Sequence, residues 1–177
     1  AKLVVAVGGD GTLNEVVNGL VRAGGTAEHA TIPLGTGMDF VRTYSIPNRF
    51  EDAVRTALSP KTRMIDVGRV AYRTWDGHDA ERFVANVGSV GMSAAVAQRA
   101  NGMSKTFGGK ATFFYALVRV FLEWENTSVR VELADGTTRE ARMHDVIVAN
   151  GRWHGGAMLL APDAEPDDGL FDVVLIG

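Results

Sequence analysis

The sequence predicts an α/β region followed by a region rich in β-strands. Residues 1–60 alternate short apolar runs, glycine-rich loops and helical patterns, which is typical of a parallel sheet with crossover helices. Residues 61–177 consist mostly of segments with strand composition, interrupted by helical stretches. We therefore place a domain boundary near residue 60.

The first region begins with a buried strand. Leu3–Val7 is a continuous apolar run rich in β-branched residues, and Gly8-Gly9 ends it. The following residues predict a helix over Leu13–Arg22, because their apolar positions lie 3, 1, 3 and 1 residues apart and two glycines follow. The other elements expected here are a strand at Thr31-Ile32 and helices near Asp39–Tyr44 and Phe50–Leu58.

The second region contains a hairpin signal and two helical patterns. Asp135-Gly136 lies between two strand-like segments and predicts a tight turn. Helices are expected at Met92–Arg99 and Thr112–Glu125. The second helix is apolar almost all round, which indicates a core helix, with contact to an acyl chain or a membrane surface as the alternative. The expected strands are Arg63–Arg73, Arg82–Val90, Ser128–Leu133, Thr138–Ala149, Met158–Ala161 and Leu170–Ile176.

Composition excludes several classes of protein. The 18 basic and 21 acidic residues give a net charge of −3, which argues against a strongly basic nucleic-acid binder. The absence of cysteine excludes a disulfide framework, a cysteine nucleophile and a cysteine-ligated metal. The four histidines show no metal-ligand spacing. Because the net charge is negative, we expect no nucleic-acid partner.

The apolar segments and the first residues of the chain indicate where in the cell the protein lies. No apolar stretch reaches the roughly 20 residues of a membrane-spanning helix, and no signal peptide is recognisable. We expect a cytoplasmic protein, with peripheral contact at the inner face of the membrane as an open alternative. The chain starts with Ala1 and runs directly into a strand, so we expect a fragment.

The strongest functional signal is the glycine-rich string over residues 8–15, GGDGTLNE. It follows a buried strand and begins a helix, so backbone N–H groups and the helix N-terminus can together bind a phosphate. A carboxylate here, Asp10, suits phosphate binding when Mg²⁺ or an ordered water lies between the two. The alternative interpretation is a structural turn in which Asp10 or Thr12 caps the helix.

Two further loops could contribute to a site. Residues 33–40, PLGTGMDF, form a second strand–loop–helix pattern, and two such loops on adjacent parallel strands would face one crevice. An ordinary turn explains this string equally well when it is taken alone. Residues 162–172, PDAEPDDGLFD, predict either a solvated acidic loop or a carboxylate presented at a sharp turn as a general base or metal ligand.

These strings, taken in order, resemble the diacylglycerol kinase catalytic-domain family, and within it the bacterial lipid kinases. The pattern is GGDGTxNEV, then PLGTGxDF, then a tail of NG, GG, AP and DDGxxDV, and it extends from residue 2 to residue 177. The resemblance implies a partial Rossmann-like or phosphofructokinase-like α/β nucleotide domain over 1–60. It implies a β-sandwich-type lipid kinase domain over 61–177, with ATP in the crevice between the two.

The resemblance also implies roles for individual residues. Asp10 and Asp39 would hold Mg²⁺ and its waters, and Asp168 would take the proton from a lipid hydroxyl. This division of labour suits phosphoryl transfer, which needs a positioned nucleophile, neutralised phosphates and the removal of one proton. The residues implied to bind ATP are Gly8, Gly9, Asp10, Gly11, Thr12, Asn14, Gly35, Thr36, Gly37 and Asp39.

The chain departs from the family pattern in three places. Met38 stands where the family usually has asparagine, and a methionine cannot replace the amide's hydrogen bonds. The family's first strand, first helix and nucleotide-contacting threonine are missing from this chain, as is part of the carboxyl-terminal sandwich. The stretch near Asn126–Ser128 offers no carboxylate for the family's structural Mg²⁺ site, which is therefore not assigned here.

The functional prediction is an ATP- and Mg²⁺-dependent kinase that phosphorylates a hydroxyl of a diacylglycerol-like lipid. One alternative is an NAD kinase-like phosphotransferase, which shares the first loop but would not be expected to carry the second loop or the DDGxxD tail. The other alternative is a nucleotide-binding module without catalysis. The identity of the lipid and the oligomeric state are not predicted.

Overall fold

The structure is a computed structural model that describes residues 1–74, 76–103 and 108–177. It divides into two compact units. The first unit contains residues 1–87 and 149–172, and the second contains residues 88–148 and 173–177. The first unit is thus built from two separate stretches of chain. The boundary near residue 60 divides the chain at one point by the pattern of its sequence, whereas these units are defined by compactness. That boundary stays a prediction.

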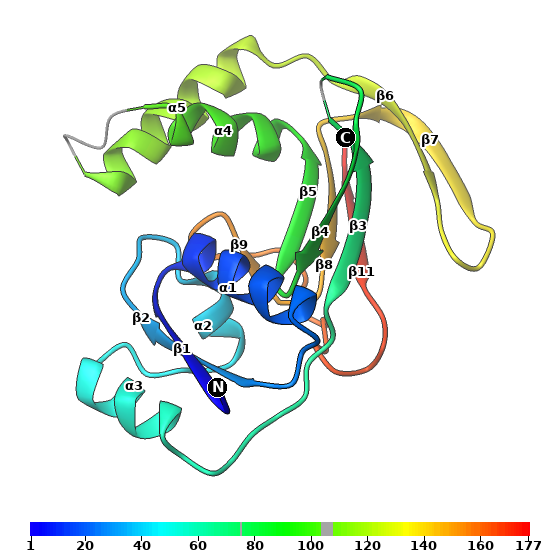
Figure 1. The fold of residues 1–177 in the computed structure, drawn as a ribbon. Coiled ribbons are helices and arrows are strands. Elements are labelled where there is room, and N and C mark those ends of the chain that lie inside the picture. Colours follow the sequence, from blue (N-terminus) through cyan, green and yellow to red (C-terminus); the bar gives the residue numbers. More distant parts are fainter. Residues whose placement is uncertain (75, 104–107) are drawn as a thin grey trace. The chain divides into compact units, whose positions relative to one another are not determined.

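The first unit carries the α/β part of the fold (Figure 1). Strand β1 (Leu3–Gly8) pairs in parallel with β2 (Glu28–Pro33), and helix α1 (Asp10–Arg22) connects them. Helices α2 (Asp39–Thr43) and α3 (Phe50–Ala57) follow. The strand, helix and loop order predicted for residues 1–60 is confirmed.

The core of this unit forms between α1, α2 and the chain near Ala85. Its buried apolar residues are Leu13, Val17, Phe40, Val41 and Ala85. The buried side chain of Asn18 connects α1 to β4 (Asp79–Val84), the partner of β3 (Gly68–Arg73) in an antiparallel hairpin. Its amide donates to the carbonyl of Phe83 at 2.7 Å and accepts the Phe83 N–H at 2.9 Å, so this polar group is satisfied by a strand backbone.

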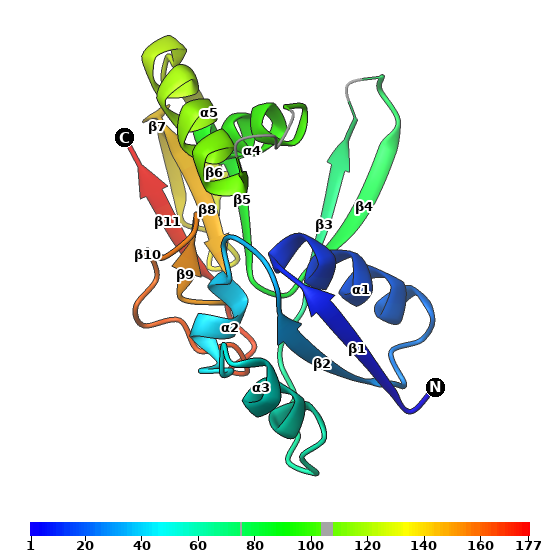
Figure 2. The same ribbon diagram turned by 90° about the vertical axis from the view of Figure 1, so that its left-hand side faces the viewer.

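The second unit is a small sheet, a hairpin and a helix pair (Figure 2). The sheet has the order β11 (Asp172–Ile176), β8 (Asp145–Ala149), β5 (Val87–Gly91). Strands β6 (Thr127–Glu132) and β7 (Thr138–Met143) pair antiparallel around the predicted Asp135-Gly136 turn. Helices α4 (Met92–Asn101) and α5 (Gly109–Glu123) pack against each other through buried Met92, Val96, Ala116 and Val120.

Two predicted strands are each divided in the structure. The stretch 82–90 ends as β4 at Val84 and resumes as β5 at Val87, because the carbonyls of Ala85 and Asn86 accept hydrogen bonds from residues 150 and 151 instead of a strand partner. The stretch 138–149 is divided at His144. There Asp145 accepts two hydrogen bonds from the N–H of Ser93 and one from its hydroxyl at 2.7 Å, which fixes the start of α4.

Helix α5 buries only one of its faces. Thr112, Ala116 and Val120 are buried, as a core helix requires. The other side exposes five large apolar residues, namely Phe114, Tyr115, Val118, Phe121 and Leu122. The prediction of a core helix therefore holds for one face. Among the described residues, no helix has the length and apolar character needed to cross a membrane.

Candidate active site

The two glycine-rich loops touch each other through their backbones. They leave the carboxyl ends of β1 and β2, where Gly8 pairs with Pro33 and the N–H of Leu34 donates to the carbonyl of Gly8 at 2.9 Å. A Cβ atom at Gly35 would lie 2.4 Å from the Cα of Gly9, far inside van der Waals contact. The parallel pairing of β1 and β2 brings both loops to one edge of the sheet. Only glycine at position 35 then allows their backbones to approach this closely.

Asp10 connects the first loop to the second. Its Oδ1 accepts the N–H of Phe40 at 2.9 Å, and its Oδ2 accepts the N–H of Asp39 at 3.2 Å. These are N–H groups of the first turn of α2, which have no partner inside the helix. The alternative interpretation had Asp10 cap its own helix, whereas its carboxylate caps the helix that follows the other loop. Each of its oxygens keeps further acceptor capacity.

Met38 adopts a left-handed backbone conformation directly before α2, with φ 60° and ψ 33°. Asparagine populates this region several times more readily than most residues do. The asparagine usual in the family pattern thus suits the backbone of this position. Met38 instead contributes its side chain to the apolar cluster around Leu13 and Phe40.

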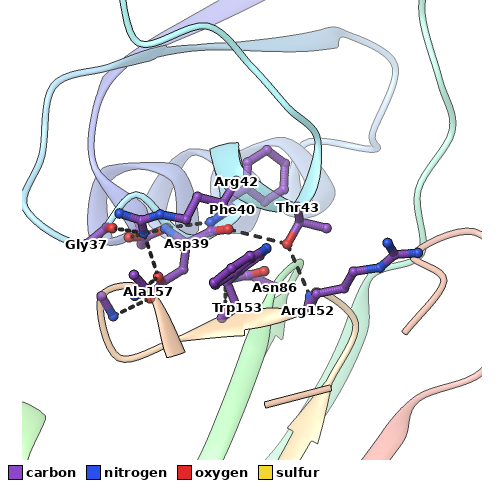
Figure 3. Close-up of polar contacts among 11 residues, drawn as sticks. Gly37, Asp39, Phe40, Arg42, Thr43, Asn86, Arg152, Trp153 and Ala157 are labelled. Carbon is purple, nitrogen blue, oxygen red and sulfur yellow. Dashed lines mark hydrogen bonds and ion pairs between the residues drawn. The ribbon is translucent and has the colours of Figure 1, made fainter. Parts of the chain in front are cut away.

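Asp39 is buried, with 6% of its surface exposed, and it joins α2 to a distant turn (Figure 3). Its two oxygens accept the N–H groups of Gly156 and Ala157, each at 2.8 Å. Arg42 donates to the same carboxylate at 3.0 Å and also to the carbonyl of Gly37. Residues 155–157 all have positive φ and join the short strands β9 (Trp153–His154) and β10 (Met158–Leu159). Asp39 therefore ties the second glycine loop to this turn.

A second contact holds the same hairpin against α2. The hydroxyl of Thr43 accepts the N–H of Arg152 at 3.1 Å and donates to the carbonyl of Asp39 at 3.3 Å (Figure 3). The side-chain amide of Asn86 donates to the carbonyl of Trp153 at 3.4 Å. The hairpin is thus fixed from both sides within the first unit.

Asp168 lies in an exposed loop of the first unit. Its Oδ1 accepts the N–H of Leu170 at 2.9 Å, and Gly169 turns the chain with φ 78°. Among the hydrogen bonds of the described residues, none occupies its Oδ2. One carboxylate oxygen is thus available as a proton acceptor.

The neighbouring Asp167 forms a two-point ion pair with Arg63. The Nε of Arg63 donates to Oδ2 at 2.8 Å and its Nη2 donates to Oδ1 at 2.5 Å. Hydrogen bonding to this guanidinium holds the pKa of Asp167 below its usual value. Nearby, burial raises the pKa of Tyr44 to about 12, so its phenol stays neutral at physiological pH.

Sequence reasoning missed Asp66, and it noted Asn150 in the NG string without giving it a role. Asp66 accepts the N–H of Gly169 at 2.7 Å through its side chain and donates its own N–H to the carbonyl of Pro166 at 2.7 Å. Asn150 is 2% exposed and donates to the carbonyls of Asp66 at 2.9 Å and Ala85 at 3.1 Å. The only local signal for Asp66 was a single carboxylate in the apolar string MIDVG.

The fit of Mg²⁺ differs between the two candidate carboxylates. Among the described residues, no group of three or more His, Asp or Glu side chains could hold a metal ion. Asp10 is half-buried and keeps free acceptor capacity, so it fits a cation that also binds phosphates. Asp39 is buried and already accepts three hydrogen bonds, so it fits such a cation less well.

The structure brings the first-loop and second-loop residues together and places Asp168 in the same unit. A separate cavity lies in the second unit, between α4 and α5. It has a volume of about 340 Å³ and is lined by Ala95, Gln98, Arg99, Val120, Glu123 and Trp124. An ion pair between Arg99 and Glu123 at 2.8 Å lies at its edge, and none of the predicted site residues lines it.

The fold and the site define a class: an α/β region with paired glycine loops, joined to a β-sandwich-like region. Residues 1–70 match the model of the diacylglycerol kinase catalytic domain, and residues 86–177 match that of the YegS C-terminal NAD kinase beta sandwich-like domain. The chain belongs to this family of bacterial diacylglycerol kinases and YegS-like lipid kinases. The predicted fold class and family are confirmed.

Individual relatives agree with this assignment. The chain is 37% identical over 175 residues to a "Probable lipid kinase YegS-like" of Pseudomonas aeruginosa, covering 98% of this chain and 54% of that protein. It is 30% identical over 177 residues to a "Diacylglycerol kinase" of Bacillus subtilis, with 98% and 54% covered. A crystal structure of a diacylglycerol kinase from Bacillus anthracis matches with a TM-score of 0.70 and 26% identity, covering 99% of this chain and 54% of that one. The chain thus spans about half the length of the relatives it matches.

The surroundings of two glycines predict opposite effects on stability when each is replaced by alanine. We expect Gly35→Ala to lower the free energy of unfolding by about 1–3 kcal/mol, because the added methyl group would overlap the backbone of Gly9. Gly19→Ala, inside α1 with no atom within 4 Å of the new methyl group, should raise it by about 0.5–1 kcal/mol. Urea unfolding measures both values. Equal stability of the two variants would contradict the close approach.

Proposed function

We propose that this chain is the core of an ATP- and Mg²⁺-dependent lipid kinase that phosphorylates a hydroxyl of a diacylglycerol-like lipid. The observation that carries the proposal is the backbone contact between Gly9 and Gly35, which joins two phosphate-type loops at one sheet edge. Family membership supports the same conclusion, since the matched relatives bear the names of lipid and diacylglycerol kinases.

The ATP phosphates would lie against the two loops. The first turn of α1 offers N–H groups that have no partner within the helix, and the helix dipole adds partial positive charge there. The proposed ATP-binding residues are those of the two loops, namely Gly8, Gly9, Asp10, Gly11, Thr12, Asn14, Gly35, Thr36, Gly37 and Asp39. Because glycine has no side chain, the phosphates can approach the backbone of these loops closely.

Mg²⁺ bound with ATP would neutralise part of the phosphate charge. Asp10 would contact it directly or through water with its remaining acceptor capacity, while still capping α2. Asp39 would contribute mainly by fixing the second loop, since its oxygens accept the N–H groups of Gly156 and Ala157.

Asp168 would act as the general base. It would take the proton of the lipid hydroxyl as the hydroxyl oxygen bonds to the γ-phosphorus and the bond from that phosphorus to the β–γ bridging oxygen breaks, leaving ADP. The exposed position of Asp168 and its available Oδ2 support this role, because an acceptor must reach the substrate hydroxyl.

Peripheral contact with a membrane surface belongs to the same proposal, because a diacylglycerol-like lipid resides in a bilayer. The exposed apolar face of α5 supports it. Phe114, Phe121 and Leu122 are 66%, 63% and 75% exposed. Leaving this much apolar surface in water is unfavourable in free energy, and such patches are typical of surfaces that bind a partner or a membrane.

A phosphate-transfer assay tests the proposal. The chain receives labelled ATP with Mg²⁺ and vesicles of a mixed lipid extract, and a parallel tube contains NAD. Label in the organic phase is the expected result, and the labelled species identifies the lipid; cosedimentation with the same vesicles reports membrane contact. Label on NAD would favour the NAD kinase-like alternative. No label in either tube, together with measurable ATP binding, would leave a nucleotide-binding module and overturn catalysis by this chain.

The role of Asp168 predicts a separation of binding from turnover. We expect Asp168→Asn to lower kcat by about 10²–10⁴-fold and to leave ATP affinity unchanged, because an amide cannot accept the proton. The matched control is Asp163→Asn, the same change at another exposed position of the loop. Isothermal titration and initial rates supply the two readouts. Equal rates for both variants would remove Asp168 from the mechanism.

The role of Asp10 predicts a loss of metal-dependent binding. Asp10→Asn removes the negative charge that would face Mg²⁺, so we expect the Mg²⁺-dependent part of ATP binding to disappear. Titrations with ATP in the presence of Mg²⁺ and of EDTA measure this part. The thermal midpoint of the variant controls for loss of the α2 cap. Wild-type ATP affinity in Mg²⁺ would contradict the assigned role.

A further inference from the structure

Arg152 lies directly before β9, where three segments of the first unit meet. Its N–H donates to the hydroxyl of Thr43, the last residue of α2, at 3.1 Å. Its carbonyl accepts the N–H groups of Leu160 and Ala161 at 3.1 and 3.3 Å. Its Nε donates to the carbonyl of Ala164 at 2.9 Å. One residue thus connects α2 to the chain that follows the β9–β10 hairpin.

The chain that follows this hairpin is the loop that carries Asp168. Residues 160–171 join β10 to β11 and form no helix or strand. Ala161 and Ala164 are 4% and 0% exposed, whereas Asp168 is exposed. The bonds from Arg152 therefore reach the buried part of the loop, and the proposed base extends from that part four residues later.

The contact with α2 continues to the glycine loops. The carboxylate of Asp10 caps the start of α2, and the hydroxyl of Thr43 donates to the carbonyl of Asp39 within the same helix (Figure 3). A hydroxyl has one proton, so this donation leaves its lone pairs for the N–H of Arg152. A continuous series of contacts therefore extends from the first glycine loop through α2 and Arg152 to Ala164.

The remaining contacts of the loop lead to another part of the chain. Arg63 bonds Asp167, and Asp66 bonds the backbone of residues 166 and 169. Both come from the segment directly before β3. Among the hydrogen bonds of the described residues, those of Arg152 are the ones that lead from this loop to α2.

We infer that Arg152 is a positioning residue that holds the loop of Asp168 at a fixed place relative to α2, and thereby relative to the phosphates. This inference rests on the proposed function, because it needs Asp168 to act as the base and ATP to lie against the glycine loops. The acceptor on Ala164 is a neutral carbonyl, so the required property of the side chain is an N–H at the place of Nε rather than a positive charge. Small displacements of a base cost large factors in rate.

The variants Arg152→Gln and Arg152→Met separate the hydrogen bond from the charge. Glutamine carries an N–H donor on the atom bonded to Cδ, as arginine does with Nε, but it has no charge. Methionine keeps an unbranched side chain and offers no donor. We expect kcat to fall by about tenfold in Arg152→Met while the KM for ATP stays within about twofold. Arg152→Gln should retain kcat within about threefold of wild type.

The matched control is Arg22→Met. The Nη2 of Arg22 donates to the carbonyl of Glu81 at 3.0 Å, so this exposed arginine makes the same kind of bond within the same unit. It is the last residue of α1, at the opposite end of that helix from the first glycine loop. The control should leave kcat and KM unchanged. A loss of kcat equal to that of Arg152→Met would overturn the inference, because it would assign the effect to any lost arginine–carbonyl bond in this unit.

Amide hydrogen exchange measures the contact without any activity. The N–H of Ala164 donates to the carbonyl of Ala161 at 3.2 Å, inside the buried part of the loop. Its exchange should quicken by about tenfold in Arg152→Met and stay near the wild-type rate in Arg152→Gln and in the control. Unchanged exchange in Arg152→Met would overturn the inference, whatever the activity. Equal kcat losses in Arg152→Met and Arg152→Gln would also overturn it, because they would assign the effect to charge.

Failure of the proposed function gives a different result. A wild-type chain without phosphate transfer would refute that function, and with it the role of Arg152 in catalysis. Quickened exchange at Ala164 in Arg152→Met would still show that Arg152 holds the loop.

Discussion

The structure of the site depends on one close backbone approach, that of Gly35 to Gly9. Parallel pairing of β1 and β2 brings the ends of both strands together, but only the lack of a side chain at Gly35 lets the loops beyond them touch. Asp10 can then reach across and cap α2, and α2 in turn presents Asp39 and Thr43 to the β9–β10 hairpin. These contacts connect the two loops, α2 and the hairpin in series.

Three carboxylates of the first unit hydrogen-bond the backbone of distant segments. Asp10, Asp39 and Asp66 all accept main-chain N–H groups, in each case from a segment at least 29 residues away. A carboxylate is a strong acceptor for N–H groups that lack other partners, so it suits loops that need a fixed shape without regular secondary structure. The same side chains can thus fix the loops and face a cation where acceptor capacity remains, as it does at Asp10.

Local pattern was sufficient for the elements of the first 60 residues and for both glycine loops. The apolar run of 3–7, the helical spacing of 13–22 and the glycines are signals carried by neighbouring residues. The misjudged features depend on distant partners. Strand 82–90 is divided because residues 150–151 hydrogen-bond the carbonyls of Ala85 and Asn86. Strand 138–149 is divided at His144, whose carbonyl accepts the N–H of Met92 at the start of α4. Asp66 escaped notice because nothing adjacent to it reveals Gly169, which is 103 residues away. The residue roles in the site stay predictions.

The return of residues 149–172 to the first unit has a consequence for the order of events during synthesis. A nascent chain emerges from the ribosome in sequence order, so residues 1–87 emerge before the turn at Gly156 that contacts Asp39. Closing a loop of that length costs entropy that only the finished contacts recover. The contact between the two glycine loops needs only residues that precede residue 60, whereas the contacts of Asp39 with Gly156 and Ala157 need the later stretch of chain as well.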